Sequence, residues 1–104
     1  MAAKKMKSVL QKEKVCYICG TTRNLEEHHI FPGSANRKKS DKRGLVVWLC
    51  DVDHRTGKTS VHNNPNGQID RYLKTTAQKY YEEHIGSREQ FRMEFGKSFI
   101  LEEE

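Results

Sequence analysis

The chain has 104 residues, which is enough for one domain with a single modest core. Lys and Arg exceed Asp and Glu by five, and residues 1–60 carry 13 basic against 6 acidic side chains, which favours a polyanionic partner. No apolar run is long enough for a signal peptide or a membrane span, so we expect a cytosolic protein without a membrane partner. Three cysteines, an odd number, argue against a secreted disulfide framework.

The N-terminal segment, residues 1–14, is rich in lysine and predicts a basic arm or a short helix. Ser8 and Gln11 within it have the spacing of a capping box, in which each side chain bonds the other residue's backbone. The next segment, VCYICGTT at residues 15–22, combines two thiols with a glycine. It predicts a tight turn of the zinc-knuckle type.

Two strands are predicted next. Residues 25–31 form the first, and residues 45–50, LVVWLC, form the stronger one because β-branched and aromatic side chains suit a sheet. The segment between them, residues 34–44, is polar and carries five Lys and Arg, and it predicts a basic loop.

Helices dominate the predictions for the second half. Residues 51–55 predict one helical turn, followed by a loop over residues 56–60. From about Gln68 to Ile85 the apolar positions recur with helical spacing, which predicts a long amphipathic helix. Gly86 is expected to end that helix.

A short final helix is predicted after Ser87, which forms a second capping-box pair with Gln90. The predicted fold class is therefore α+β. We expect three parts: the arm at residues 1–14, one folded domain at residues 15–101 and an acidic tail at residues 102–104.

The cysteines predict a structural zinc site. Cys16 and Cys19 have the C-x-x-C spacing that holds one tetrahedral ion, and Cys50 adds a third thiolate from a distant segment. The fourth ligand stays open between Asp53 and His54. Asp53 follows Cys50 in a C-x-x-D spacing that parallels the C-x-x-C pair, whereas the imidazole of His54 suits zinc better. A chain with only 35% apolar residues benefits from the stability that zinc supplies.

The histidines predict a second centre. His28 and His29 are adjacent on a predicted strand, so their side chains point to opposite sides and take two different roles, ligand and base. His54 and His62 also lie near the cysteines in the sequence. His84 lies late in the amphipathic helix and is expected at the surface.

Taken in order, these motifs resemble the HNH, or ββα-metal, nucleases, and most of all small phage HNH proteins and the phage RecA-dependent nuclease group. The resemblance covers residues 16–81. The matching strings are CYICG at 16–20, EHHI at 27–30, LVVWLC at 45–50, DH at 53–54 and VH at 61–62. It implies a small zinc-stabilised ββα-metal domain that cleaves DNA with a divalent ion.

The resemblance also implies roles for individual residues. His29 matches the general base that deprotonates water. His28 and His54 match the ligands of the catalytic ion, with His62 as an additional ligand, and the three catalytic residues are then His28, His29 and His54. Asp53 matches the position of the fourth zinc ligand. The catalytic ion stays open among Mg, Mn, Ni and Zn, since imidazole binds several metals.

The chain departs from the family pattern at the middle Asn of the motif, where it has Gly44 and Leu45. The orienting role of that residue then passes to a backbone carbonyl or to another residue, for which Asn36, Asn63 and Asn64 are the candidates.

DNA is the expected partner, with phage packaging or recombination proteins as further ones. The basic residues expected to hold phosphates without reading sequence are Arg37, Lys38, Lys39, Lys42 and Arg43. The alternative is a zinc-stabilised DNA-binding module without catalysis. That alternative uses the same cysteines and basic residues but leaves the histidines unexplained.

Overall fold

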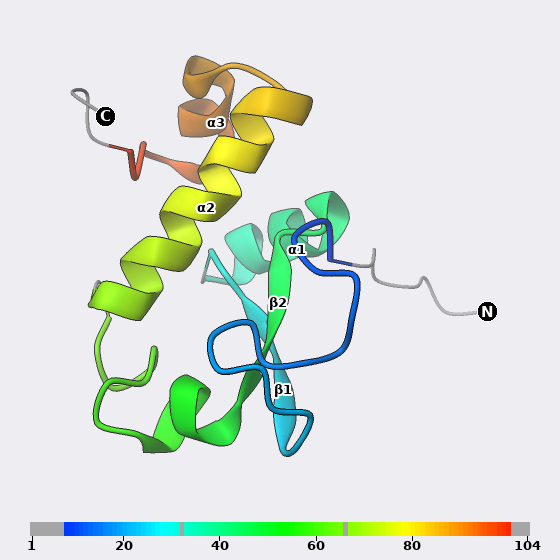
Figure 1. The fold of residues 1–104 in the computed structure, drawn as a ribbon. Coiled ribbons are helices and arrows are strands. Elements are labelled where there is room, and N and C mark those ends of the chain that lie inside the picture. Colours follow the sequence, from blue (N-terminus) through cyan, green and yellow to red (C-terminus); the bar gives the residue numbers. More distant parts are fainter. Residues whose placement is uncertain (1–7, 32, 66, 101–104) are drawn as a thin grey trace.

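The computed structural model describes residues 8–31, 33–65 and 67–100. Its elements are β1 (Leu25–His29), α1 (Ser34–Arg43), β2 (Val46–Cys50), the helical turn η1 (Val52–Thr56), α2 (Gln68–His84) and α3 (Arg88–Phe95). The two strands pair antiparallel, and Figure 1 shows the long α2 passing beside this sheet with α3 at its C-terminal end. The α+β class is therefore confirmed. The predicted acidic tail and the first half of the predicted arm lie outside the described residues.

The described part of the predicted arm, residues 8–14, contains no helix and is bound to the rest of the domain. Ser8 Oγ accepts a hydrogen bond from the Gln11 N–H at 3.2 Å, which is half of a capping box. The Gln11 side chain does not complete the box. It accepts from the Trp48 N–H of β2 at 2.8 Å and donates to the Val15 carbonyl at 2.6 Å.

The predicted loop at residues 34–44 is wrong, because this segment forms α1. Its side chains are polar all round the axis, so no apolar period marks it as a helix. Its end is regular: Gly44 adopts the left-handed conformation, φ 74°, that glycine favours after a helix. Lys42 and Arg43 lie in the last turn, where cations interact favourably with the helix dipole.

The remaining predicted helices are confirmed. α2 begins at Gln68, and α3 begins with a complete capping box in which Ser87 and Gln90 bond each other's backbone. The turn predicted at residues 51–55 is present as η1, in the wider π-helical form. Among the residues described, no helix is both long and apolar enough to cross a membrane.

The core joins the sheet to the C-terminal helices. Phe31, two residues after the end of β1, is fully buried in this core and contacts two rings of α3, with centroids 5.3 Å from Phe91 and 4.6 Å from Phe95. The strands and α2 supply further buried residues to the same cluster, including Val47, Leu49, Leu73 and Ala77. Because one cluster holds all of these elements, the polar side chains that they carry are fixed relative to one another.

Candidate metal centres

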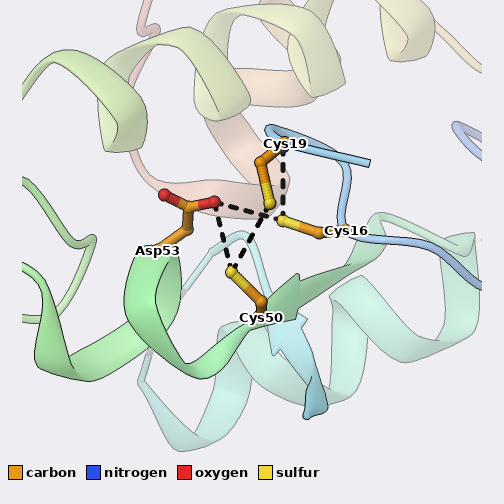
Figure 2. Close-up of side chains that lie close together, drawn as sticks. All are labelled: Cys16, Cys19, Cys50 and Asp53. Atoms are coloured by element: carbon orange, nitrogen blue, oxygen red, sulfur yellow. Dashed lines mark hydrogen bonds between the residues drawn. The ribbon is translucent and has the colours of Figure 1, made fainter. Parts of the chain in front are cut away.

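Three cysteines and one aspartate lie together between the N-terminal turn and η1 (Figure 2). Asp53 Oδ2 is 3.2 Å from Cys16 Sγ and 3.3 Å from Cys50 Sγ, and Cys19 Sγ is 3.7 Å from Cys50 Sγ. The four ligand atoms lie within 4.8 Å of one another, and their chemistry fits one tetrahedral zinc ion. Asp53 is the candidate fourth ligand that lies in this group, whereas His54 belongs to a different group.

Local geometry brings the four ligands together. Gly20, with φ 83°, closes the N-terminal turn, and its N–H donates to the Cys16 carbonyl at 2.9 Å, which folds Cys19 back toward Cys16. Cys50 is the last residue of β2, and Asp53 follows one turn later in η1. Figure 2 shows these side chains pointing toward one another from the turn, the strand end and the helical turn.

The two buried thiols differ in acidity. Burial raises the pKa of the Cys16 thiol, but backbone hydrogen bonds, first of all with Cys19, outweigh it and leave that pKa below its usual value. Burial raises the pKa of Cys50 to about 12. Since zinc binds thiolates and displaces their protons, an ion at this group would supply the charge that keeps Cys50 ionised.

A second group consists of three histidines. His28 comes from β1, His54 from η1 and His62 from the segment after it, and their ring nitrogens lie within 4.8 Å of one another. The Nε2 atoms of His54 and His62 are 3.0 Å apart. His62 is held there by its own backbone, because its N–H donates to the His54 carbonyl at 3.0 Å.

One nitrogen atom of this group has the properties of a metal ligand. His28 Nε2 is buried, and it has no hydrogen-bond partner among the described residues. Buried polar atoms are nearly always satisfied, so this nitrogen fits a ligand to a cation. The three histidines line a pocket of about 200 Å³.

Electrostatics favour the same interpretation. Burial, together with the neighbouring His54 and His62, lowers the pKa of His28 to about 3. Burial and His54 also lower the pKa of His62. Both imidazoles are therefore neutral near pH 7, which is the form that binds metal.

Glu26 orients one of the three ligands, a role that motif reading missed. Its Oε1 lies 2.5 Å from His54 Nδ1, and Arg55 Nε donates to the same oxygen at 3.0 Å. The hydrogen bond with His54 is the main reason that the pKa of Glu26 is lowered. A carboxylate on Nδ1 leaves the Nε2 lone pair of His54 directed at the other imidazoles. Strand alternation was the available signal, since Glu26 lies on the same face of β1 as His28.

His29 lies in a third group, on the opposite face of β1 from His28, as the strand alternation predicts. Its Nε2 is 2.8 Å from Asp41 Oδ1 of α1 and 4.0 Å from Glu27 Oε1. Motif reading did not find Asp41, because the residue lies in the segment predicted as a loop. Glu27 and His29 also line the pocket of the three histidines, so the two groups share one opening.

None of the three candidates for the middle Asn contacts His29. Asn36 donates to a backbone carbonyl at the end of α3. Asn63 and Asn64 donate to backbone carbonyls of η1 and of the loop that follows it, and so support their shape. The carboxylate that bonds His29 instead belongs to Asp41. His84 is exposed on α2, as expected.

The basic residues of α1 divide into two sets. Arg43 donates to both carboxylate oxygens of Glu94 in α3, at 3.0 and 3.1 Å, and Lys39 donates to the backbone carbonyl of the same residue. These two side chains therefore connect helices. The other three predicted phosphate-binding residues are exposed: Arg37, Lys38 and Lys42.

No protein-family model matches the chain, and neither a curated protein nor a solved structure does. The functional argument therefore rests on the chemistry of the three groups.

Proposed function

We propose that the chain is a metal-dependent DNA endonuclease of the HNH type, which hydrolyses phosphodiester bonds. The observation that carries the proposal is the convergence of His28, His54 and His62 around a buried nitrogen without a partner, in a pocket that His29 also lines. Three imidazoles without a carboxylate suit Zn or Ni better than Mg. When bound, such an ion supplies positive charge at the scissile phosphate and the leaving 3′ oxygen.

His29 takes the proton from the attacking water. Its Nε2–H donates to Asp41 at 2.8 Å, which leaves the Nδ1 lone pair as the proton acceptor. Asp41 then stabilises the imidazolium that forms. The hydrogen bond to the carboxylate keeps the proton on Nε2, so the ring stays in the tautomer whose Nδ1 can accept a proton.

Two arginines supply the charge that a phosphate needs. Arg37 of α1 and Arg55 of η1 both line the pocket, and Arg55 is 60% exposed despite its contact with Glu26. Lys38 and Lys42 of α1 are exposed, and in this proposal they bind flanking phosphates, which gives affinity without sequence specificity.

The deciding experiment is nicking of supercoiled plasmid DNA by zinc-loaded protein, with Mg, Mn, Ni and Zn added in turn. We expect nicking that EDTA abolishes. His29→Ala should lower the rate by about 10²–10⁴-fold, because a general base contributes that much, while the variant keeps its zinc content and its affinity for DNA. His84→Ala is the matched control and should cut like the wild type.

If the wild type binds DNA but nicks it with none of the four ions, the chain is the non-catalytic module instead. If His29→Ala cuts at the wild-type rate, His29 is not the base.

A further inference from the structure

We propose that Glu27, His29 and Asp41 form a second divalent-cation site, and that an ion bound there prevents His29 from acting as a base. The binding site stands on the geometry alone, whereas the effect on His29 rests on the proposed endonuclease activity.

The geometry brings three ligands of two types together from two elements. Glu27 and His29 are two residues apart on β1 and so share a face, and α1 brings Asp41 over that face. Glu27 Oε1 is 4.0 Å and Asp41 Oδ1 2.8 Å from His29 Nε2, and the three ligand atoms lie within 4.8 Å of one another. All three residues are partly exposed, so an ion can reach them from solvent.

The donor set selects a different ion from that of the three histidines. Two carboxylates and one imidazole bring two negative charges to this group, whereas the three-histidine group brings none. Carboxylates suit harder ions and imidazole suits Zn, Ni and similar ions, so Mn²⁺ and Zn²⁺ satisfy both donor types here. Mn²⁺ should prefer this group to the three histidines, because oxygen ligands contribute more of its coordination.

Coordination and base catalysis require opposite tautomers of His29. As a base, His29 carries its proton on Nε2, donates it to Asp41 and accepts the water proton at Nδ1. As a ligand in this group, it uses the Nε2 lone pair for the metal, so its single proton moves to Nδ1. A protonated Nδ1 has no lone pair for a water proton, and the ion also withdraws electron density from the ring. The bound ion therefore blocks the reaction without touching the three histidines.

The site is tested first by binding. Protein with its cysteine zinc in place is titrated with Mn²⁺, and free Mn²⁺ is measured by electron paramagnetic resonance. We expect Glu27→Gln and Asp41→Asn each to weaken one Mn²⁺ site at least tenfold. The control Glu89→Gln, which changes an exposed carboxylate of α3, should bind like the wild type.

Retained zinc content shows that each variant is folded. If both Glu27→Gln and Asp41→Asn bind Mn²⁺ within tenfold of the wild type, there is no such site. The same holds if Glu89→Gln loses as much affinity as they do.

The consequence for His29 is tested by nicking over the range of Mn²⁺ concentrations that fills this site in the wild type but leaves the weakened site of Glu27→Gln empty. The wild-type rate should fall as that site fills, and the rate of Glu27→Gln should not. A wild-type rate that stays level across this range would overturn the inhibitory role. If no plasmid is nicked under any condition, the proposed function fails, while the Mn²⁺ titration still decides whether the site exists.

Discussion

At the scale of single residues, the burial of His28 makes the stability of the protein depend on pH. His28 stays neutral in the folded state down to about pH 3, whereas in the unfolded chain it binds a proton near pH 6.5. The unfolded state therefore gains protons first as the pH falls, and the free energy of unfolding decreases below pH 6.5 by about 1.4 kcal/mol per pH unit. Urea unfolding of protein without an ion at the histidines should show this decrease between pH 6.5 and 5.5.

The matched variants for that measurement are His28→Asn and His84→Asn. His28→Asn removes the titrating group and should flatten the dependence, although His62, whose pKa is also lowered, keeps part of it. His84 is exposed, so His84→Asn should leave the slope unchanged. Equal slopes in all three proteins would mean that His28 is not the group responsible.

Two consecutive residues, Asp53 and His54, should respond in opposite ways to substitution. Asp53 contacts Cys16 and Cys50, so Asp53→Ala should release zinc and lower the melting temperature. His54 contacts His62, so His54→Ala should keep the zinc and abolish nicking. Zinc analysis, a thermal melt and the plasmid assay check this, and the reverse pattern would assign the zinc to His54.

Site residues that are identified by local spacing can be predicted from the sequence, whereas those that depend on a contact between separate elements cannot. Spacing predicts the three cysteines, and alternation along one strand separates the roles of His28 and His29. Asp41 could not be found this way, because its distance from His29 depends on a helix that the sequence pattern does not reveal. Glu26 was available from the same alternation, but a carboxylate on a strand has no distinctive motif.

At the scale of elements, the contact of α1 with α3 decides which basic residues of α1 are exposed for the proposed binding of DNA. Lys38 and Lys42 are exposed, and each phosphate contact that they make contributes about 0.9 to the slope of log K against log salt. Lys38→Ala with Lys42→Ala should therefore reduce that slope by about 1.8. Fluorescence anisotropy with a short duplex at several salt concentrations measures it.

The control for α1 is Arg43→Ala, since Arg43 forms two hydrogen bonds with Glu94. It should leave the salt slope close to that of the wild type and destabilise the protein, because the partly buried carboxylate of Glu94 loses two hydrogen bonds and keeps the one from Tyr81. A large loss of slope in Arg43→Ala alone would place the phosphates over the junction of α1 and α3.

The elements themselves were predictable where burial imposes a period. Both strands and α2 show such a period, and α3 is marked by the capping-box pair Ser87 and Gln90. α1 shows no such period, because it packs through polar contacts such as Asn36 with the end of α3, and its side chains are polar on all sides. Tertiary contacts between polar groups leave no periodic trace in the sequence, and so this helix was predicted as a loop.

At the scale of the whole molecule, the cysteine group ties the N-terminal turn to the end of the sheet. The core is modest for 104 residues, and structural zinc contributes on the order of 10 kcal/mol in small domains. Cys16→Ser should therefore lower the melting temperature strongly and release zinc. Elemental analysis and calorimetry check this. A wild-type protein that contains no zinc, and whose melt is unchanged by chelator, would contradict it.

The adjacency of Asp53 and His54 limits how this chain can change its length during evolution. One inserted residue between them would rotate His54 by roughly a quarter of a turn around the axis of η1 relative to Asp53, so the two groups could not both be kept. In η1 the Gly57 N–H donates to the Val52 carbonyl, so its hydrogen bond already spans one residue more than in an α-helix. Insertions within η1 are therefore not tolerable, and homologous chains should keep Asp53 and His54 side by side.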